Sequence, residues 1–166
     1  RGHRQHVRPD VRVSGLMSEK KRRVLSAVLI CLCIATAAFI WGNSMLGSKA
    51  SSNVSNSVLG ALNPIIRRFG ILSKSDLWLR KLAHFAEFAA LGAELLFLAA
   101  VNGKLGFQSA SNCAFAALLA ALTDETIQLV SGRNSQVRDV LLDFLGALTG
   151  ILIAWLICRL IKKRRA

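Results

Sequence analysis

Four long apolar segments, separated by shorter polar ones, dominate the chain. A helix that crosses the hydrocarbon core of a bilayer needs about 20 mostly apolar residues, because each residue adds about 1.5 Å of length. The segments that meet this requirement are residues 24–42, 82–101, 105–130 and 137–158. The pattern therefore predicts an all-α fold, a four-helix transmembrane bundle.

The one long connection, residues 43–80, has a helical pattern of its own. Val54, Val58 and Leu62 recur at intervals of four residues behind a run that is rich in Ser and Asn. Apolar residues at this spacing share one face of a helix, as in helices that lie in the membrane interface. We therefore expect a short amphipathic segment on the outer surface between the first and second membrane helices.

The distribution of charge strengthens the membrane interpretation. The chain is 53% hydrophobic with a net charge of +13, and its basic residues gather at the two ends: residues 1–23 hold eight Lys and Arg, and residues 159–165 hold five. Basic clusters beside apolar helices are typical of anchors against anionic lipid. We expect the lipid bilayer as a partner, and the lack of any groove-binding motif excludes nucleic acid. The pattern makes no prediction of oligomeric state.

The number of helices and the basic ends together predict the orientation. An even number of membrane helices places both termini on one side, and basic segments remain in the cytoplasm. We therefore expect a multi-pass protein of the cell membrane with both termini cytoplasmic. Residues 35–37, Ala-Thr-Ala, resemble the cleavage site of a signal peptide, but the apolar run continues through residues 39–41 and favours an uncleaved first helix.

The start of the chain has a different character. Met17 is the first methionine, and a basic segment and the first apolar run follow it directly. This order is typical of a natural start before a membrane helix. We therefore expect residues 1–16 to be a disordered or non-native extension, and residues 17–166 to form a single membrane domain.

Polar residues follow one face of the second apolar segment. Lys81, His84 and Glu87 are spaced three residues apart, so they lie on one side of a helix that turns about 100° per residue. Glu94 lies about 20 Å further along the helix from Lys81, near the middle of the bilayer. A charged group at that depth is costly unless it has a partner.

The third and fourth apolar segments carry carboxylates at the ends that meet. Asp124, Glu125 and Gln128 close the third segment, and Asp139 and Asp143 open the fourth. A four-helix topology brings these ends to the same level as the start of the second segment. The sequence therefore predicts that polar residues from three helices come together at the outer surface.

The short connection and the packing face complete this cluster. Arg133 and Arg138 lie in or beside the connection, so they stay near the carboxylates, and Gly146 and Gly150 share the face of the two aspartates. A Gly-x-x-x-Gly spacing lets membrane helices approach closely, so we assign both glycines to helix packing. The predicted outward-facing polar cluster comprises Lys81, His84, Glu87, Asp124, Glu125, Gln128, Arg133, Arg138, Asp139 and Asp143.

Two interpretations of the polar cluster are open. In the structural one, the basic side chains neutralise the acids and hold three helix ends together. In the functional one, the cluster is a site for an anionic ligand, and the candidates for acid–base catalysis are His84, Glu87, Asp124 and Glu125. A single histidine without a second histidine motif does not predict a metal site, and no cofactor is expected.

Three segments together resemble the VanZ-like family of small bacterial membrane proteins. They are RKLAHFAEFAALG from residue 80, DETIQ from residue 124 and GRNSQVRDVLLDFLGALTG from residue 132. The resemblance extends over about residues 24–158. The positions that match the family pattern are Lys81, His84, Phe85, Glu87, Asp124, Glu125, Gln128, Gly132, Arg133, Asp139, Val140, Asp143, Gly146 and Gly150.

The chain departs from that pattern at three positions. Ile127 stands where many relatives have His, Phe88 where Tyr is common, and Ser131 where Pro is frequent. The missing second imidazole beside Glu125 weakens the metal and hydrolase interpretations. The family's namesake is associated with low-level resistance to teicoplanin, so the resemblance implies a role at the cell envelope without implying a reaction.

Three functions remain on this basis. The leading one is modulation of the cell envelope, including glycopeptide susceptibility, through binding of an anionic lipid or cell-wall precursor at the polar cluster without turnover. The second is an enzyme that acts on a lipid-linked or phosphorylated envelope intermediate, in which Lys81, Arg133 and Arg138 hold the anion. The third is a small proton-coupled carrier, in which Glu94 would be essential.

Overall fold

The computed structural model describes residues 18–45, 76–132 and 136–164 of the chain. Residues 1–16, expected to be an extension, and the expected amphipathic segment before residue 76 lie outside these ranges. The described residues form four helices, each long and apolar enough to cross a membrane, so the prediction of an all-α four-helix membrane fold is confirmed. The helices are α1 (Glu19–Met45), α3 (Asp76–Val101), α4 (Phe107–Val130) and α5 (Val137–Arg164).

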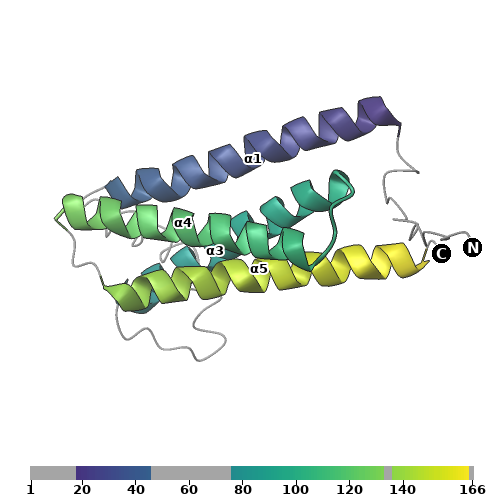
Figure 1. Cartoon of the computed structure of the whole chain (residues 1–166). Coiled ribbons are helices and arrows are strands. Elements are labelled where there is room, and N and C mark those ends of the chain that lie inside the picture. The colour runs from purple at the N-terminus through teal and green to yellow at the C-terminus, as the bar shows by residue number, and fades with distance from the viewer. Residues whose placement is uncertain (1–17, 46–75, 133–135, 165–166) are drawn as a thin grey trace, which may run out of the picture.

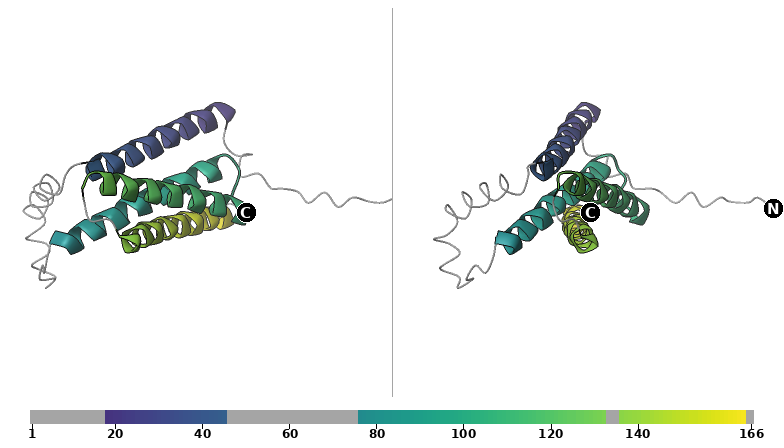
Figure 2. Two further views of the ribbon diagram at one scale, coloured as in Figure 1. Left: turned by 60° about the vertical axis from the view of Figure 1, so that its left-hand side comes forward. Right: turned by 90° about the vertical axis from the view of Figure 1, so that its left-hand side faces the viewer.

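The helices α3 and α4 lie between α1 and α5, as Figure 1 and the views in Figure 2 show. The most extensive contact joins α3 to α5, and α1 contacts α3 and α4. Burial on α1 is confined to its last turns, at Ile40 and Ser44. Most of α1 therefore presents apolar side chains such as Val28 and Ile34 outward, as a helix surrounded by lipid would.

A small apolar core lies between the helices. Phe88 and Leu91 of α3 are buried against Ala117 and Ala121 of α4 and against Ala147 of α5. Alanine is small, so it lets the helix backbones approach while the larger residues fill the space between them. Large side chains from α3 are thus set against small residues of α4 and α5, and Ile40 of α1 and Ile151 of α5 add two further large members to the core.

Close backbone contact fixes α5 against α3. A Cβ atom added at Gly146 would collide with the backbone carbonyl of Phe85, and one added at Gly150 would collide with the backbone of Ala89. On α3, Gly92 faces the backbone of Ala147 in the same way. Because there is no side chain at these three points, the backbones of the two helices are in direct van der Waals contact.

The turn between α3 and α4 stops α3 sharply. Gly103 has a φ of +75°, a conformation that residues with a Cβ rarely adopt. Its N–H donates to the carbonyl of Ala100 at 3.0 Å, and the N–H of Lys104 donates to Ala99 at 2.9 Å. These bonds satisfy carbonyl groups at the end of α3 that have no partner within the helix.

Gly150→Ala tests the contact between α3 and α5. The added methyl group would meet backbone atoms of Ala89, which cannot rotate away, so the helices must separate. We expect a loss of about 1–3 kcal/mol in the free energy of unfolding, the usual cost of overpacking, seen as a lower thermal midpoint in detergent.

Gly42→Ala is the matched control for this variant. Nothing lies within 4 Å of a Cβ at Gly42, and alanine is the better helix former. The midpoint of this variant should therefore stay the same or rise. An equal decrease of the thermal midpoint in both variants would contradict the close-contact explanation.

Candidate ligand site at one end of the bundle

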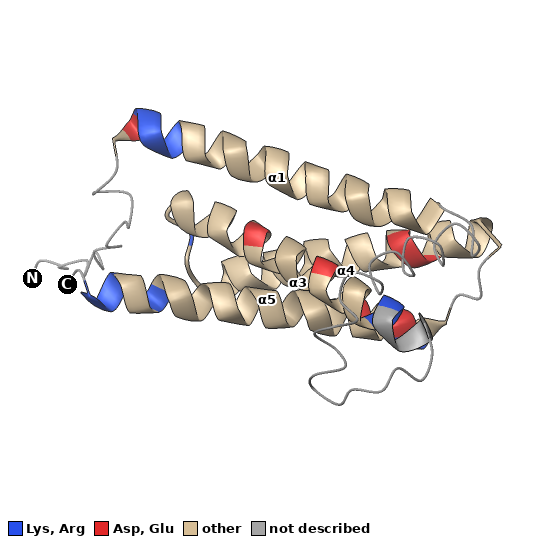
Figure 3. Cartoon of the chain, turned by 180° about the vertical axis from the view of Figure 1, so that it is seen from behind, with Lys and Arg blue, Asp and Glu red and all other residues tan. Residues whose placement is uncertain are grey.

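Charged residues are divided unequally between the two ends of the bundle. Figure 3 shows basic residues at the start of α1 and at the end of α5, and acidic residues gathered toward the opposite end. At that opposite end lie the start of α3, the end of α4 and the start of α5. Polar residues from these three helices therefore meet at one level.

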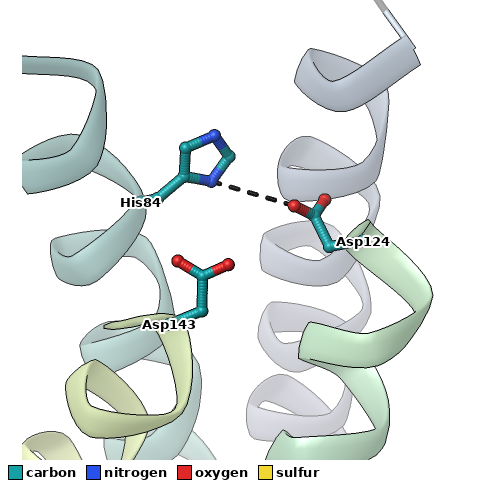
Figure 4. Close-up of side chains that lie close together, drawn as sticks. All are labelled: His84, Asp124 and Asp143. Atoms are coloured by element: carbon teal, nitrogen blue, oxygen red, sulfur yellow. Dashed lines mark ion pairs between the residues drawn. The ribbon is translucent and has the colours of Figure 1, made fainter. Parts of the chain in front are cut away.

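The most compact group in this region comes from three different helices. His84 of α3, Asp124 of α4 and Asp143 of α5 each offer one ligand atom, and these atoms lie within 4.8 Å of one another. Figure 4 shows the three side chains directed toward a common point. His84 Nδ1 lies 3.9 Å from Asp124 Oδ2, close enough for electrostatic attraction to the carboxylate when the imidazole is protonated. We call this group the triad.

Asp124 is the most deeply buried member of the triad. Its side chain is 0% exposed, and Gln128, one turn along α4, donates from Nε2 to Oδ2 at 2.7 Å. The other oxygen, Oδ1, has no hydrogen-bond partner among the described residues. A buried carboxylate oxygen without a partner costs free energy, since it has lost the water that would solvate it.

Glu87 lies beside the triad. Its Oε2 atom is 3.7 Å from His84 Nδ1, and its side chain is 20% exposed. His84 therefore lies near two carboxylates, one on its own helix and one on α4. An imidazole between two carboxylates is suited to hold a proton or to act as a ligand.

Glu125 has a different role from its neighbour Asp124. Its Oε1 atom accepts a hydrogen bond of 2.7 Å from the backbone N–H of Gln136, the residue before α5. A carboxylate at the start of a helix satisfies a free N–H group and interacts favourably with the helix dipole. Glu125 thus ties the end of α4 to the start of α5, while its Oε2 atom has no described partner.

Lys81 is engaged at the rim of the cluster. Its Nζ atom lies 2.6 Å from Asp139 Oδ1, and both side chains are partly exposed. This ion pair joins α3 to α5 nearer the end of the bundle than the triad. Among the described residues, no Lys or Arg forms an ion pair with the four deeper acids, which are Glu87, Asp124, Glu125 and Asp143.

Arg138 of the predicted cluster differs from the other described members. Arg138 is exposed, and it forms no ion pair or hydrogen bond with a described residue. Arg133 lies outside the described residues. The structure therefore places Lys81 and Asp139 at the rim and brings six other predicted residues to the same end of the bundle, but it does not pair Arg138 with them. The six are His84, Glu87, Asp124, Glu125, Gln128 and Asp143.

Glu94 belongs to a separate contact deeper in the bundle. Thr36 of α1 donates a hydrogen bond of 2.9 Å from its hydroxyl to Glu94 Oε1. The sequence pattern did not predict Thr36 as the partner of Glu94, although a hydroxyl in the middle of an apolar segment is a signal that could have done so. Gln136 was not predicted either, because it acts through its backbone and therefore leaves no trace in residue type.

The comparisons with known proteins agree with this architecture. A family profile described as VanZ/LLP1 matches residues 20–159, which is most of the chain and includes the triad. Comparisons with curated proteins and with solved structures gave no match. The chain therefore belongs to the VanZ/LLP1 family and is a multi-pass membrane protein.

Proposed function

We propose that this protein modulates the cell envelope, and with it susceptibility to glycopeptide antibiotics, by binding an anionic envelope component at the polar cluster. The observation that carries the proposal is the buried carboxylate of Asp124, one oxygen of which has no described partner. A cluster that served only to hold the helices together would be expected to pair that oxygen. A group kept at a cost to stability is typical of a binding site.

The rim of the cluster supports an anionic ligand. Lys81 is 38% exposed, Arg138 is exposed and Arg80 is half-buried, and all three lie at the same end of the bundle. Basic side chains at a rim attract an anionic lipid headgroup or cell-wall precursor from the membrane surface. Without a bound cation the buried acids would repel the anionic group, so the basic rim has to hold it.

The distribution of basic residues supports an outward-facing cluster. The start of α1 and the end of α5 carry most of the described Lys and Arg. Basic ends remain in the cytoplasm, so both termini are cytoplasmic in this proposal and the polar cluster faces the outer surface. An antibiotic that acts outside the cell would share that side of the membrane.

Asp124→Asn separates binding from a structural role. Asparagine keeps the shape and can accept the hydrogen bond from Gln128, while it removes the buried charge. We expect unchanged or higher thermal stability in metal-free detergent solution, together with teicoplanin susceptibility equal to that of cells that lack the protein. Thr123→Ala, on an exposed side of the same helix, should keep both properties. Lower stability of Asp124→Asn would support a purely structural cluster instead.

The orientation is tested by two single cysteines in a chain whose native cysteines are replaced by alanine. Gln136 and Lys104 are both exposed, one in the α4–α5 connection and the other in the α3–α4 turn. Gln136→Cys should react with a membrane-impermeant maleimide added to intact cells. Lys104→Cys should react only after the membrane is opened. The opposite result would place the cluster in the cytoplasm.

An enzyme is the second candidate, because His84 lies 3.7 Å and 3.9 Å from two carboxylates. Such a group could transfer protons in a reaction of a lipid-linked or phosphorylated intermediate. Binding without turnover predicts that the pool of lipid-linked precursors is the same in cells with the wild-type protein and with His84→Gln. A product that appears only with the wild-type protein, measured by lipid mass spectrometry, would establish the enzyme.

A further inference from the structure

The triad has the arrangement of a metal site that is close to its bound geometry. Its ligand atoms come from three helices and lie within 4.8 Å of one another. Nitrogen and oxygen ligands bind a divalent ion at about 2.0–2.2 Å, so neighbouring ligands on one ion are about 3 Å apart. Rotation of the side chains about their own bonds could close this difference without movement of the helices.

Burial of both acids in their ionised form requires a compensating charge. Asp124 is 0% exposed and Asp143 is 2% exposed, and neither forms an ion pair with a described Lys or Arg. Two carboxylates in a region of low dielectric repel each other and lose the solvation of water. A divalent cation between them would remove both costs at once.

The surroundings of Asp124 resemble those of a metal ligand. Gln128 holds one oxygen by a hydrogen bond of 2.7 Å, and the oxygen that remains, Oδ1, is buried without a described partner. Carboxylates that bind metals are oriented in this way by neighbouring side chains. The oxygen that Gln128 holds, Oδ2, is the one that lies near His84, and the unpartnered Oδ1 belongs to the same oriented carboxylate.

We infer that His84, Asp124 and Asp143 bind one divalent cation, of the Mn²⁺ or Zn²⁺ type, and that this cation receives the anionic group of the envelope component. One imidazole and two carboxylates suit these ions better than Mg²⁺ or Ca²⁺, which prefer oxygen ligands alone. The cation also explains how an acidic site accepts an anion: two carboxylates and a dication are together neutral, and an open coordination position attracts a phosphate or carboxylate oxygen. Only the claim that the cation receives the anionic group depends on the proposed function; the binding of the cation does not.

Metal binding is measured on the purified full chain in detergent, after removal of metals with a chelator. Titration with MnCl₂ or ZnCl₂ alone, followed by calorimetry and by metal analysis, should give one ion per chain. The ion should also raise the thermal unfolding midpoint, because it binds the folded protein. Loss of a residue that only orients a metal ligand lowers the metal affinity by about 10–100-fold. Asp143→Asn removes a ligand itself, so it should weaken binding by about 100-fold or more.

Glu94→Gln is the matched control, because it removes a carboxylate of α3 that lies outside the polar cluster. Glutamine can still accept the hydrogen bond from Thr36, and this variant should bind the ion like the wild-type protein. With Mn²⁺ bound, electron spin echo spectra should show coupling to a ¹⁴N nucleus in the wild type and not in His84→Gln. This spectrum identifies the imidazole even if the Asp143 variant folds poorly.

Two results would overturn the inference. One is the absence of stoichiometric binding, as expected if a proton or the guanidinium of Arg133 compensates the acids. The other is equal weakening by Asp143→Asn and Glu94→Gln. Failure of the proposed function has a different signature: the purified protein binds the ion, and Asp143→Asn abolishes that binding, but the variant leaves teicoplanin susceptibility unchanged in cells.

Discussion

The backbone contact between α3 and α5 is the constraint on which the candidate site depends. Gly146 packs against the carbonyl of Phe85 and Gly150 against Ala89, with no side chain between them. The contact fixes both the rotation and the register of the two helices. His84 precedes Phe85 by one residue and Asp143 precedes Gly146 by three, so the same contact sets the distance between these two members of the triad.

The third member of the triad depends on a different set of interactions. Asp124 is brought to His84 by α4, whose end is tied to the start of α5 through the hydrogen bond from Gln136 to Glu125. The adjacent acids of α4 thus differ in the partner that each holds. Glu125 accepts a hydrogen bond from the backbone before the neighbouring helix, whereas Asp124 accepts one from Gln128 of its own helix. Each keeps a second oxygen without a described partner, and the carboxylate of Asp124 is the one that lies beside His84.

Most of the fold could be predicted from the sequence, and the reason is the bilayer. A helix of about 20 apolar residues is the simplest structure in which the backbone N–H and C=O groups find hydrogen-bond partners in lipid. Each apolar segment therefore specifies one helix. The observed α4 (Phe107–Val130) begins two residues after the expected start at residue 105 and ends where expected. The observed α5 extends six residues beyond the expected end at residue 158, because its last turns carry basic side chains that a search for apolar residues does not count.

Within one helix, spacing alone also groups the polar residues. Lys81, His84 and Glu87 had to share a face, because three-residue intervals return to one side of a helix. Spacing carries no information across helices, however. It could not pair Lys81 with Asp139, nor Thr36 with Glu94, nor separate Arg138 from the acids. Each of these outcomes depends on the rotation and relative height of two helices, which their packing sets.

By itself, the sequence determined that this protein has four membrane helices and that acidic and basic residues from three of them approach one end. Hydrophobic length and helical periodicity are local properties, so they can be read along the chain. Only the tertiary structure decided which acids bind the backbone or a lysine and which remain beside His84. The choice among Asp124, Glu125, Asp139 and Asp143 required atoms on different helices to come within a few ångströms. Contact between glycine and backbone determines that arrangement for α3 and α5, and the hydrogen bond from Gln136 to Glu125 ties α4 to α5.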